Sequence, residues 1–166
     1  PPVFIASRGV GEIVVGLNFG VLMAQGAYFV QTQKFSGEVF WASLPVALLI
    51  TAVLYINEFP DYKADKQVGK THLVVRWGRK KALAGYMVLM LLTYIFILLG
   101  TITRIMPIWT LLAFLTFPLA WQAIKIAKTY YDHPPQLILA NANTIKVHLG
   151  TGILLSLGYI ISRVVG

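Results

Sequence analysis

The sequence has 166 residues, of which 57% are hydrophobic and 12% are charged. Soluble domains carry about 25% charged residues, so this composition excludes an ordinary water-soluble globule, and the scattered glycines exclude collagen-like and low-complexity chains. The sequence contains no cysteine, which excludes disulfides, thiolate metal sites and a cysteine nucleophile. A membrane protein remains, and its formal net charge of +8 is therefore interpreted as a membrane topology signal and not as a sign of a nucleic-acid partner.

Apolar stretches of membrane-spanning length occur at five places. A bilayer core about 30 Å thick needs about 20 helical residues, and stretches of that length lie at 10–30, 39–57, 82–103, 105–127 and 142–162. The second and third contain no charged residue over 39–56 and 82–103, a property that amphipathic soluble helices do not share. We therefore expect an all-α, polytopic transmembrane bundle of five spans that forms a single membrane domain over residues 1–166.

The basic residues are distributed unequally between the two sides of the predicted membrane. With five spans, eleven lysines and arginines fall on the side of the N-terminus and the loop after span two, whereas Lys34, Arg104 and Arg163 fall on the other side. Cytoplasmic loops carry an excess of Lys and Arg, so this count places the N-terminus and the loop at 57–81 in the cytoplasm, and the C-terminus outside.

The residues suited to chemistry concentrate in this predicted cytoplasmic loop. Asn57, Asp61 and Asp65 are spaced four apart, so on a continued helix they fall within an arc of roughly 80°. A solvated charged face would be the usual interpretation, but like charges four residues apart repel, and neither aspartate has a basic residue three or four positions away. Carboxylate and amide oxygens suit a hard ion, and Mg²⁺ commonly binds one or two carboxylates together with phosphate oxygens. The spacing therefore favours a magnesium and diphosphate site.

The residues after these aspartates are candidate phosphate contacts. Gly69 is expected to end the helix, and Lys70 and Arg76 follow within reach, Arg with the bidentate geometry that suits phosphate oxygens. His72 neighbours Lys70 but has no carboxylate partner that the sequence reveals, so a general-base role for it rests on position alone.

Three stretches resemble a known family. NEFPDYKADKQVGKTHLVVRWG resembles the second aspartate-rich motif of the UbiA-type intramembrane prenyltransferases, through Asn-x3-Asp-x3-Asp, Gly-Lys and Val-Arg-x-Gly. PPVFIASRGVGEIVVGLNFGVLMAQGAYFVQT and NANTIKVHLGTGILLSLG look like the menaquinone branch, the 1,4-dihydroxy-2-naphthoate polyprenyltransferases. The family implies a nine-helix bundle whose two aspartate-rich motifs bind a prenyl diphosphate through Mg²⁺. This chain resembles the last five helices, so the first four helices and the first motif are implied partners, and the chain alone is expected to be an incomplete enzyme.

Transferred to this sequence, the resemblance makes Asp61 and Asp65 catalytic Mg²⁺ ligands with Asn57 beside them, and makes Lys70 and Arg76 diphosphate contacts. It implies Mg²⁺-dependent transfer of a polyprenyl group to an aromatic quinone precursor, here 1,4-dihydroxy-2-naphthoate, with loss of the carboxylate. 4-Hydroxybenzoate or a glycerol phosphate lipid remain alternative acceptors. A non-catalytic membrane subunit or transporter whose loop binds anionic lipid is the rival from another class. The expected location is the plasma membrane of a prokaryote.

Other polar residues in the spans have two interpretations each. Tyr62 could shield an allylic cation, although aromatic side chains at membrane boundaries are commonly interfacial anchors. Asn18 and Gln25 lie seven residues apart on one helix face, where they could line an acceptor pocket or bond between helices. Glu12 is expected to pair with Arg8, four residues earlier.

Overall fold

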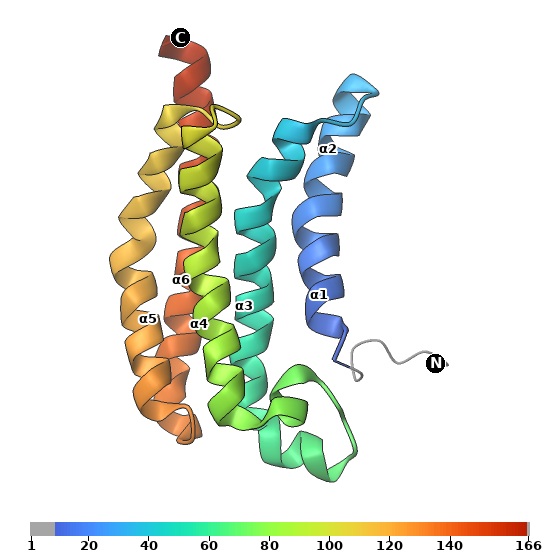
Figure 1. Cartoon of the computed structure of the whole chain (residues 1–166), viewed down its shortest axis with the longest axis vertical. Helices are drawn as coiled ribbons and strands as arrows, with labels where there is room; N and C mark the ends of the chain where they lie inside the picture. The colour runs from blue at the N-terminus through green and yellow to red at the C-terminus, as the bar shows by residue number, and fades with distance from the viewer. Residues whose placement is uncertain (1–8, 166) are drawn as a thin grey trace.

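In the computed structural model, residues 9–165 are described, and they form a bundle of long helices (Figure 1). The first crossing is built from α1 (Gly11–Gly16), the π-helical segment η2 (Leu17–Leu22) and α2 (Met23–Thr32). Five helical segments are long and apolar enough to cross a membrane, which confirms the predicted five-span fold. The later crossings are α3 (Gly37–Gln67), α4 (Leu73–Ile102), the 3₁₀ helix η3 (Ile108–Thr116) with α5 (Phe117–Tyr130), and α6 (Pro134–Val165).

The helices continue beyond the apolar stretches from which the spans were predicted. α3 ends at Gln67 and α4 begins at Leu73, so the segment predicted as a loop over 57–81 is mostly helical. A charged residue ends an apolar stretch, but the backbone N–H and C=O groups still need partners, and a continued helix supplies them on either side of the membrane boundary. α4 bends at Gly78, where φ is 74° and ψ is 152°.

α3 is the central helix of the bundle. It contacts the first crossing on one side and α4 and α6 on the other, as Figure 1 shows. The first crossing approaches α3 through Gly16 and Gly20, a Gly-x3-Gly pair that faces Ala47. A methyl group at Gly16 would lie 3.1 Å from the Ala47 carbonyl oxygen, and one at Gly20 would overlap Ala47 itself. These two glycines therefore allow the close backbone contact that holds the first crossing against α3.

Buried hydroxyl groups connect the remaining helices. The Tyr86 hydroxyl of α4 lies 2.6 Å from Thr144 Oγ1 of α6, within a core that also contains Tyr55 and Phe59 of α3. Nearer the other end of α4, Thr116 Oγ1 lies 2.8 Å from the Tyr94 hydroxyl and 2.9 Å from Thr151 Oγ1. Such hydrogen bonds between helices add to the packing that holds membrane bundles together, where the surrounding lipid is as apolar as the side chains.

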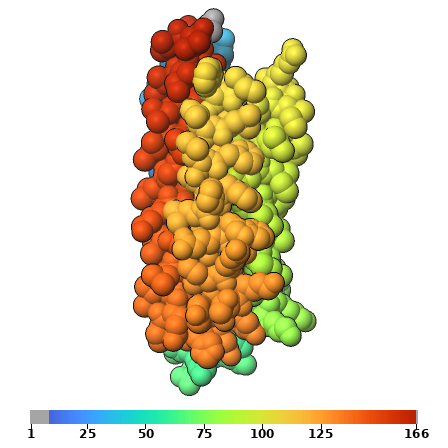
Figure 2. Space-filling view, turned by 90° about the vertical axis from the view of Figure 1, so that its left-hand side faces the viewer, coloured from blue at the N-terminus to red at the C-terminus, as the bar shows by residue number. Residues whose placement is uncertain are grey.

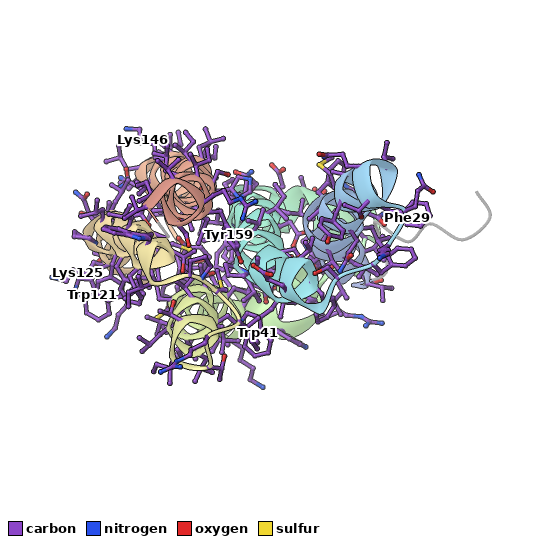
Figure 3. The ribbon with its side chains drawn as sticks, turned by 90° about the horizontal axis from the view of Figure 1, so that it is seen from above. Phe29, Trp41, Trp121, Lys125, Lys146 and Tyr159 are labelled. Atoms are coloured by element: carbon purple, nitrogen blue, oxygen red, sulfur yellow. The ribbon has the colours of Figure 1, made fainter. Side chains whose placement is uncertain are left out.

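The outer surface of the η3–α5 crossing and of α6 carries many exposed apolar side chains, together with exposed lysines such as Lys125 and Lys146. In Figure 2, α6 and the η3–α5 crossing lie side by side, and their exposed residues include Leu115, Ile138, Leu149 and Ile153. Figure 3, viewed along the bundle, places Trp121, Lys125 and Lys146 at the outer edge and Tyr159 between the helices. Exposed aliphatic side chains over such a length are typical of a lipid-facing surface.

Candidate functional site

A pocket of about 280 Å³ lies where α3 ends and the chain turns back into α4. Asn57, Asp61 and Asp65 all line it, as expected for residues four apart on one continuous helix. Lys70 lines the same pocket, and Leu54, Glu58 and His72 complete its wall. The structure therefore brings the three predicted oxygen ligands together with one of the two predicted phosphate contacts.

The end of α3 explains how Lys70 reaches the pocket. The Lys70 N–H donates to the Asp65 carbonyl at 3.0 Å and the Gly69 N–H donates to the Lys66 carbonyl at 3.3 Å, which is the hydrogen-bond pattern of a Schellman turn. Gly69 adopts the left-handed conformation that this turn requires, with φ at 74°. The expectation that Gly69 ends the helix is thereby confirmed.

This turn also pairs charges that the sequence analysis treated as separate. Lys70 Nζ lies 2.7 Å from Asp65 Oδ1, and this hydrogen bond raises the pKa of the Lys70 ammonium. The chain reverses after Gly69 and brings Lys70, five residues after Asp65, into contact with it. The lack of a basic residue three or four positions from Asp65 therefore did not reveal its partner.

The second oxygen of Asp65 faces a histidine. His72 Nε2 lies 3.0 Å from Asp65 Oδ2, and His72 Nδ1 lies 3.1 Å from Glu58 Oε2. His72 is the residue directly before α4 and is only 2% exposed. The expectation that His72 lacks a carboxylate partner was wrong, because both of its ring nitrogens face carboxylate oxygens.

Glu12 reaches the same region from the first crossing. It is 1% exposed, and its Oε1 accepts a hydrogen bond of 2.7 Å from the backbone N–H of Leu73, the first residue of α4. Its predicted partner, Arg8, lies outside the described residues. The ligand-type atoms of Glu12, Glu58 and His72 all lie within 4.8 Å of one another. The sequence analysis did not predict this cluster, because its members are far apart along the chain. The one available signal was that each is a polar residue near the end of a predicted span.

The other predicted site residues occupy different surroundings. Asn57 Oδ1 accepts a 2.6 Å hydrogen bond from Asn141 Nδ2, so α6 supports the pocket from the side. Three of the predicted site residues do not line the pocket. Arg76 is exposed beside Gly9, and Asn18 is exposed on η2. The ring of Tyr62 lies under the guanidinium of Arg79.

Gln25, which shares a helix face with Asn18, makes a local structural contact. Its Nε2 donates to the Ser36 carbonyl at 2.7 Å, which ties α2 to the start of α3.

An apolar pocket of about 430 Å³ lies further along α3, between the first crossing and α6. Val39 and Val46 of α3, Met23 of α2 and Tyr159 of α6 are among its lining residues, and Figure 3 shows Tyr159 directed between the helices. Positions 39, 43 and 46 fall within about 100° of positions 57, 61 and 65 on the wheel of α3. The acidic pocket and the apolar pocket therefore lie along one side of the same helix.

The donor set of the acidic pocket fits a hard divalent cation. Its candidate ligands are two carboxylates and an amide oxygen, with no thiolate in the sequence, and such oxygen ligands suit Mg²⁺. The neighbouring ammonium of Lys70 is suited to a phosphate oxygen.

Comparison with known proteins gives the family. The model of the UbiA prenyltransferase family matches residues 2–145. A 2-carboxy-1,4-naphthoquinone phytyltransferase of Synechocystis is 28% identical over 96% of this chain and 52% of its own length. The 1,4-dihydroxy-2-naphthoate octaprenyltransferase of Bacillus subtilis is 29% identical over 97% of this chain and 51% of its own length. A protein described as UbiA prenyltransferase domain-containing protein 1, from Dictyostelium discoideum, is 33% identical over 58% of this chain and 29% of its own length.

The chain belongs to the UbiA prenyltransferase family. With its five apolar helices it is an integral membrane protein that resembles prenyltransferases acting on naphthoate-type acceptors. The chain spans about half the length of these two relatives. No solved structure gives a significant match.

Proposed function

We propose that this chain supplies one half of the catalytic site of a Mg²⁺-dependent prenyltransferase that transfers a polyprenyl group from a prenyl diphosphate to 1,4-dihydroxy-2-naphthoate. The other half, with the first aspartate-rich motif, corresponds to the part of the relatives that this chain does not span. The motif pocket faces the cytoplasm, and the expected membrane is the plasma membrane of a prokaryote. The observation that carries the proposal is the convergence of Asn57, Asp61, Asp65 and Lys70 on one pocket.

Asp61, Asp65 and Asn57 are the residues that would hold Mg²⁺. The ion supplies neutralisation of the charge that builds on the diphosphate as the allylic C–O bond breaks. With a diphosphate bound, Lys70 would exchange its bond to Asp65 for a phosphate oxygen; Asp65 would then be free to help hold the cation, and the ammonium would stabilise the leaving group. The acceptor ring attacks the allylic carbon as the diphosphate leaves, and the ring carboxylate departs as CO₂, so no protein nucleophile is required.

The isoprenoid chain would extend from this pocket along α3. The apolar pocket near Val46 lies on the same side of α3 as Asp61, about 22 Å away at 1.5 Å per helical residue. α6 forms the opposite wall at both ends, through Asn141 beside Asn57 and through Tyr159 in the apolar pocket. This arrangement places the charged head of the substrate at the end of the bundle and its hydrocarbon between helices, which suits a prenyl diphosphate.

The test is an assay of the full-length protein with isotopically labelled prenyl diphosphate and a panel of acceptors. Asp61→Asn keeps the size of the side chain and removes its charge, so we expect turnover to fall about 100-fold or more. We expect a similar fall in turnover for Asp65→Asn. Lys128→Gln is the control, because Lys128 is an exposed charged residue of α5 that lines neither the acidic pocket nor the apolar pocket.

Near wild-type turnover in either aspartate variant would contradict the metal assignment. A preference for 4-hydroxybenzoate or a glycerol phosphate lipid over 1,4-dihydroxy-2-naphthoate would overturn the proposed acceptor. Lack of transfer to any acceptor on the panel would favour a non-catalytic role.

A further inference from the structure

Glu12, Glu58 and His72 form a second group of ligand-type side chains behind the acidic pocket. They come from three elements, the first turn of α1, the polar end of α3 and the residue before α4. Glu12 and His72 are almost fully buried. Glu58 and His72 also line the pocket that contains Asp61. The cluster is therefore an interior site with access to the pocket.

Each member of this cluster has one buried polar atom without an aligned hydrogen-bond partner among the described residues, and the carboxyl groups of Glu12 and Glu58 lie within hydrogen-bonding reach of each other. Within the part of the chain that the structure describes, Glu12 Oε2, Glu58 Oε2 and His72 Nδ1 are buried and have no hydrogen-bond partner. His72 Nδ1 and Glu58 Oε2 lie 3.1 Å apart without hydrogen-bond alignment. Among residues 9–165, neither glutamate forms an ion pair with a lysine or arginine. Two buried carboxyl groups this close together cannot both stay ionised unless a cation or a shared proton compensates their charge.

Two of the three ligands, Glu12 and His72, are fixed by a contact through their other polar atom. Glu12 Oε1 is held by the Leu73 N–H, which leaves Oε2 directed into the cluster. His72 Nε2 is held by Asp65 Oδ2 at 3.0 Å, which leaves Nδ1 directed at Glu58. A histidine that binds a metal through one nitrogen commonly donates the other N–H to a carboxylate in this manner, because the carboxylate fixes the tautomer and the ring orientation.

We propose that Glu12, Glu58 and His72 bind a divalent transition-metal ion, Mn²⁺ or Zn²⁺, at a site separate from the Mg²⁺ and diphosphate pocket. The imidazole nitrogen favours these ions over Mg²⁺, and the two carboxylates match the double positive charge. Ligands at about 2.1 Å from a common ion lie at most about 4.2 Å apart, so small side-chain movements convert the observed 4.8 Å limit into a bound geometry.

The ion has a positional role in this arrangement. It links the first crossing to α3 and to the start of α4, and through His72 it holds Asp65 at the rim of the pocket. The site does not depend on prenyl transfer and would be present with no substrate bound.

The experiment measures metal content and stability of the full-length protein in detergent, without prenyl diphosphate. The protein is stripped with a chelator and titrated with Mn²⁺ in the presence of a large excess of Mg²⁺, and bound Mn²⁺ is followed by electron paramagnetic resonance. We expect one tightly held Mn²⁺ per chain, lost or weakened about tenfold or more in Glu12→Gln and Glu58→Gln. Gln at position 12 can still accept the Leu73 N–H, so the local fold is preserved.

Two controls separate this site from the proposed catalytic one. Asp61→Asn should keep the Mn²⁺ while it loses prenyl transfer, and Lys128→Gln, at an exposed position on α5, should keep both. Mn²⁺ should raise the unfolding temperature of the wild type and of Asp61→Asn, but not that of Glu12→Gln, whose melting in chelator also reports whether the variant folds.

Three results would overturn the inference. The first is a wild-type protein that holds no Mn²⁺ or Zn²⁺ in excess Mg²⁺. The second is a bound ion that disappears in Asp61→Asn. The third is a Glu58→Gln variant that binds Mn²⁺ as well as the wild type; this result, like a metal-free wild type, would indicate that the two glutamates share a proton instead.

Discussion

Arg79 joins three parts of the molecule around the motif, and its removal is a direct test of the fold that positions the site. Its Nε donates to the Phe59 carbonyl of α3 at 3.1 Å, and its Nη1 lies 2.7 Å from Asp132 Oδ1 in the turn between α5 and α6. The guanidinium lies 5.0 Å from the centre of the Tyr62 ring, and the side chain is only 6% exposed. We expect Arg79→Ala to destabilise the bundle strongly.

The magnitude follows from the buried contacts. A hydrogen bond from a charged donor contributes about 1.5–3 kcal/mol, and the cation–π contact with Tyr62 about 0.5–1 kcal/mol, so the loss is about 2–4 kcal/mol. Arg76→Ala is the matched control, because Arg76 lies on the same helix but is exposed, and its removal should change stability by less than about 0.5 kcal/mol. Unfolding in mixed micelles, titrated with a denaturing detergent, measures both. Equal effects of the two substitutions would refute the reasoning.

The ion pair with Asp132 adds a pH dependence of known sign. The hydrogen bond from Arg79 to Asp132 lowers the pKa of the Asp132 carboxyl. A carboxyl whose pKa is lowered on folding stabilises the fold above its unfolded pKa of about 3.9, and this contribution disappears as the pH falls through the folded pKa. The difference in stability between the wild type and Asp132→Asn should therefore be present at neutral pH and vanish in strong acid.

Three further substitutions test other parts of the account. Lys70→Met should raise the KM for prenyl diphosphate more than the KM for the acceptor; equal changes would argue against a phosphate contact. Gly20→Leu forces a side chain into the contact with Ala47 and should reduce the free energy of unfolding by about 1–3 kcal/mol, whereas Gly26→Leu, at an open position, should be tolerated. Lys80→Cys adds a cysteine to a sequence that has none, and it should react with an impermeant thiol reagent only from the cytoplasmic side. Labelling from outside intact cells would reverse the proposed topology.

The number of membrane spans could be predicted from the sequence because it depends on a local property. A run of about 20 apolar residues is stable as a helix in lipid whatever it packs against, so each span could be identified alone. The ends of the helices could not, because α3 beyond Asn57 and α4 before Ala82 are polar helical segments whose packing involves α6 and the α5–α6 turn. Hydropathy contains no information about such contacts.

The pocket was predictable to the extent that it lies on one helix. Asn57, Asp61 and Asp65 share a helix face through their spacing, and the structure places them in one pocket. The Glu12 cluster was not predictable, because Glu12 and His72 meet only through the packing of the first crossing on α3. Glu12 also had a plausible local partner in Arg8, and a local pairing is the natural inference when tertiary contacts are unknown.

At Asp65, the spacing in the sequence and the contacts in the fold indicate different partners. Its spacing from Asp61 predicts a metal ligand, yet its oxygens are occupied by Lys70 from the turn and by His72 from the start of α4. The Lys70 side chain is 49% exposed, and ion pairs of exposed lysines contribute little to stability because water and salt screen them. Under the proposed function, a divalent cation and a diphosphate would displace this pair with little loss of stability, whereas the buried contact with His72 would keep the carboxylate in position. The pocket is thus suited to exchange one cation for another without movement of the helix that carries it.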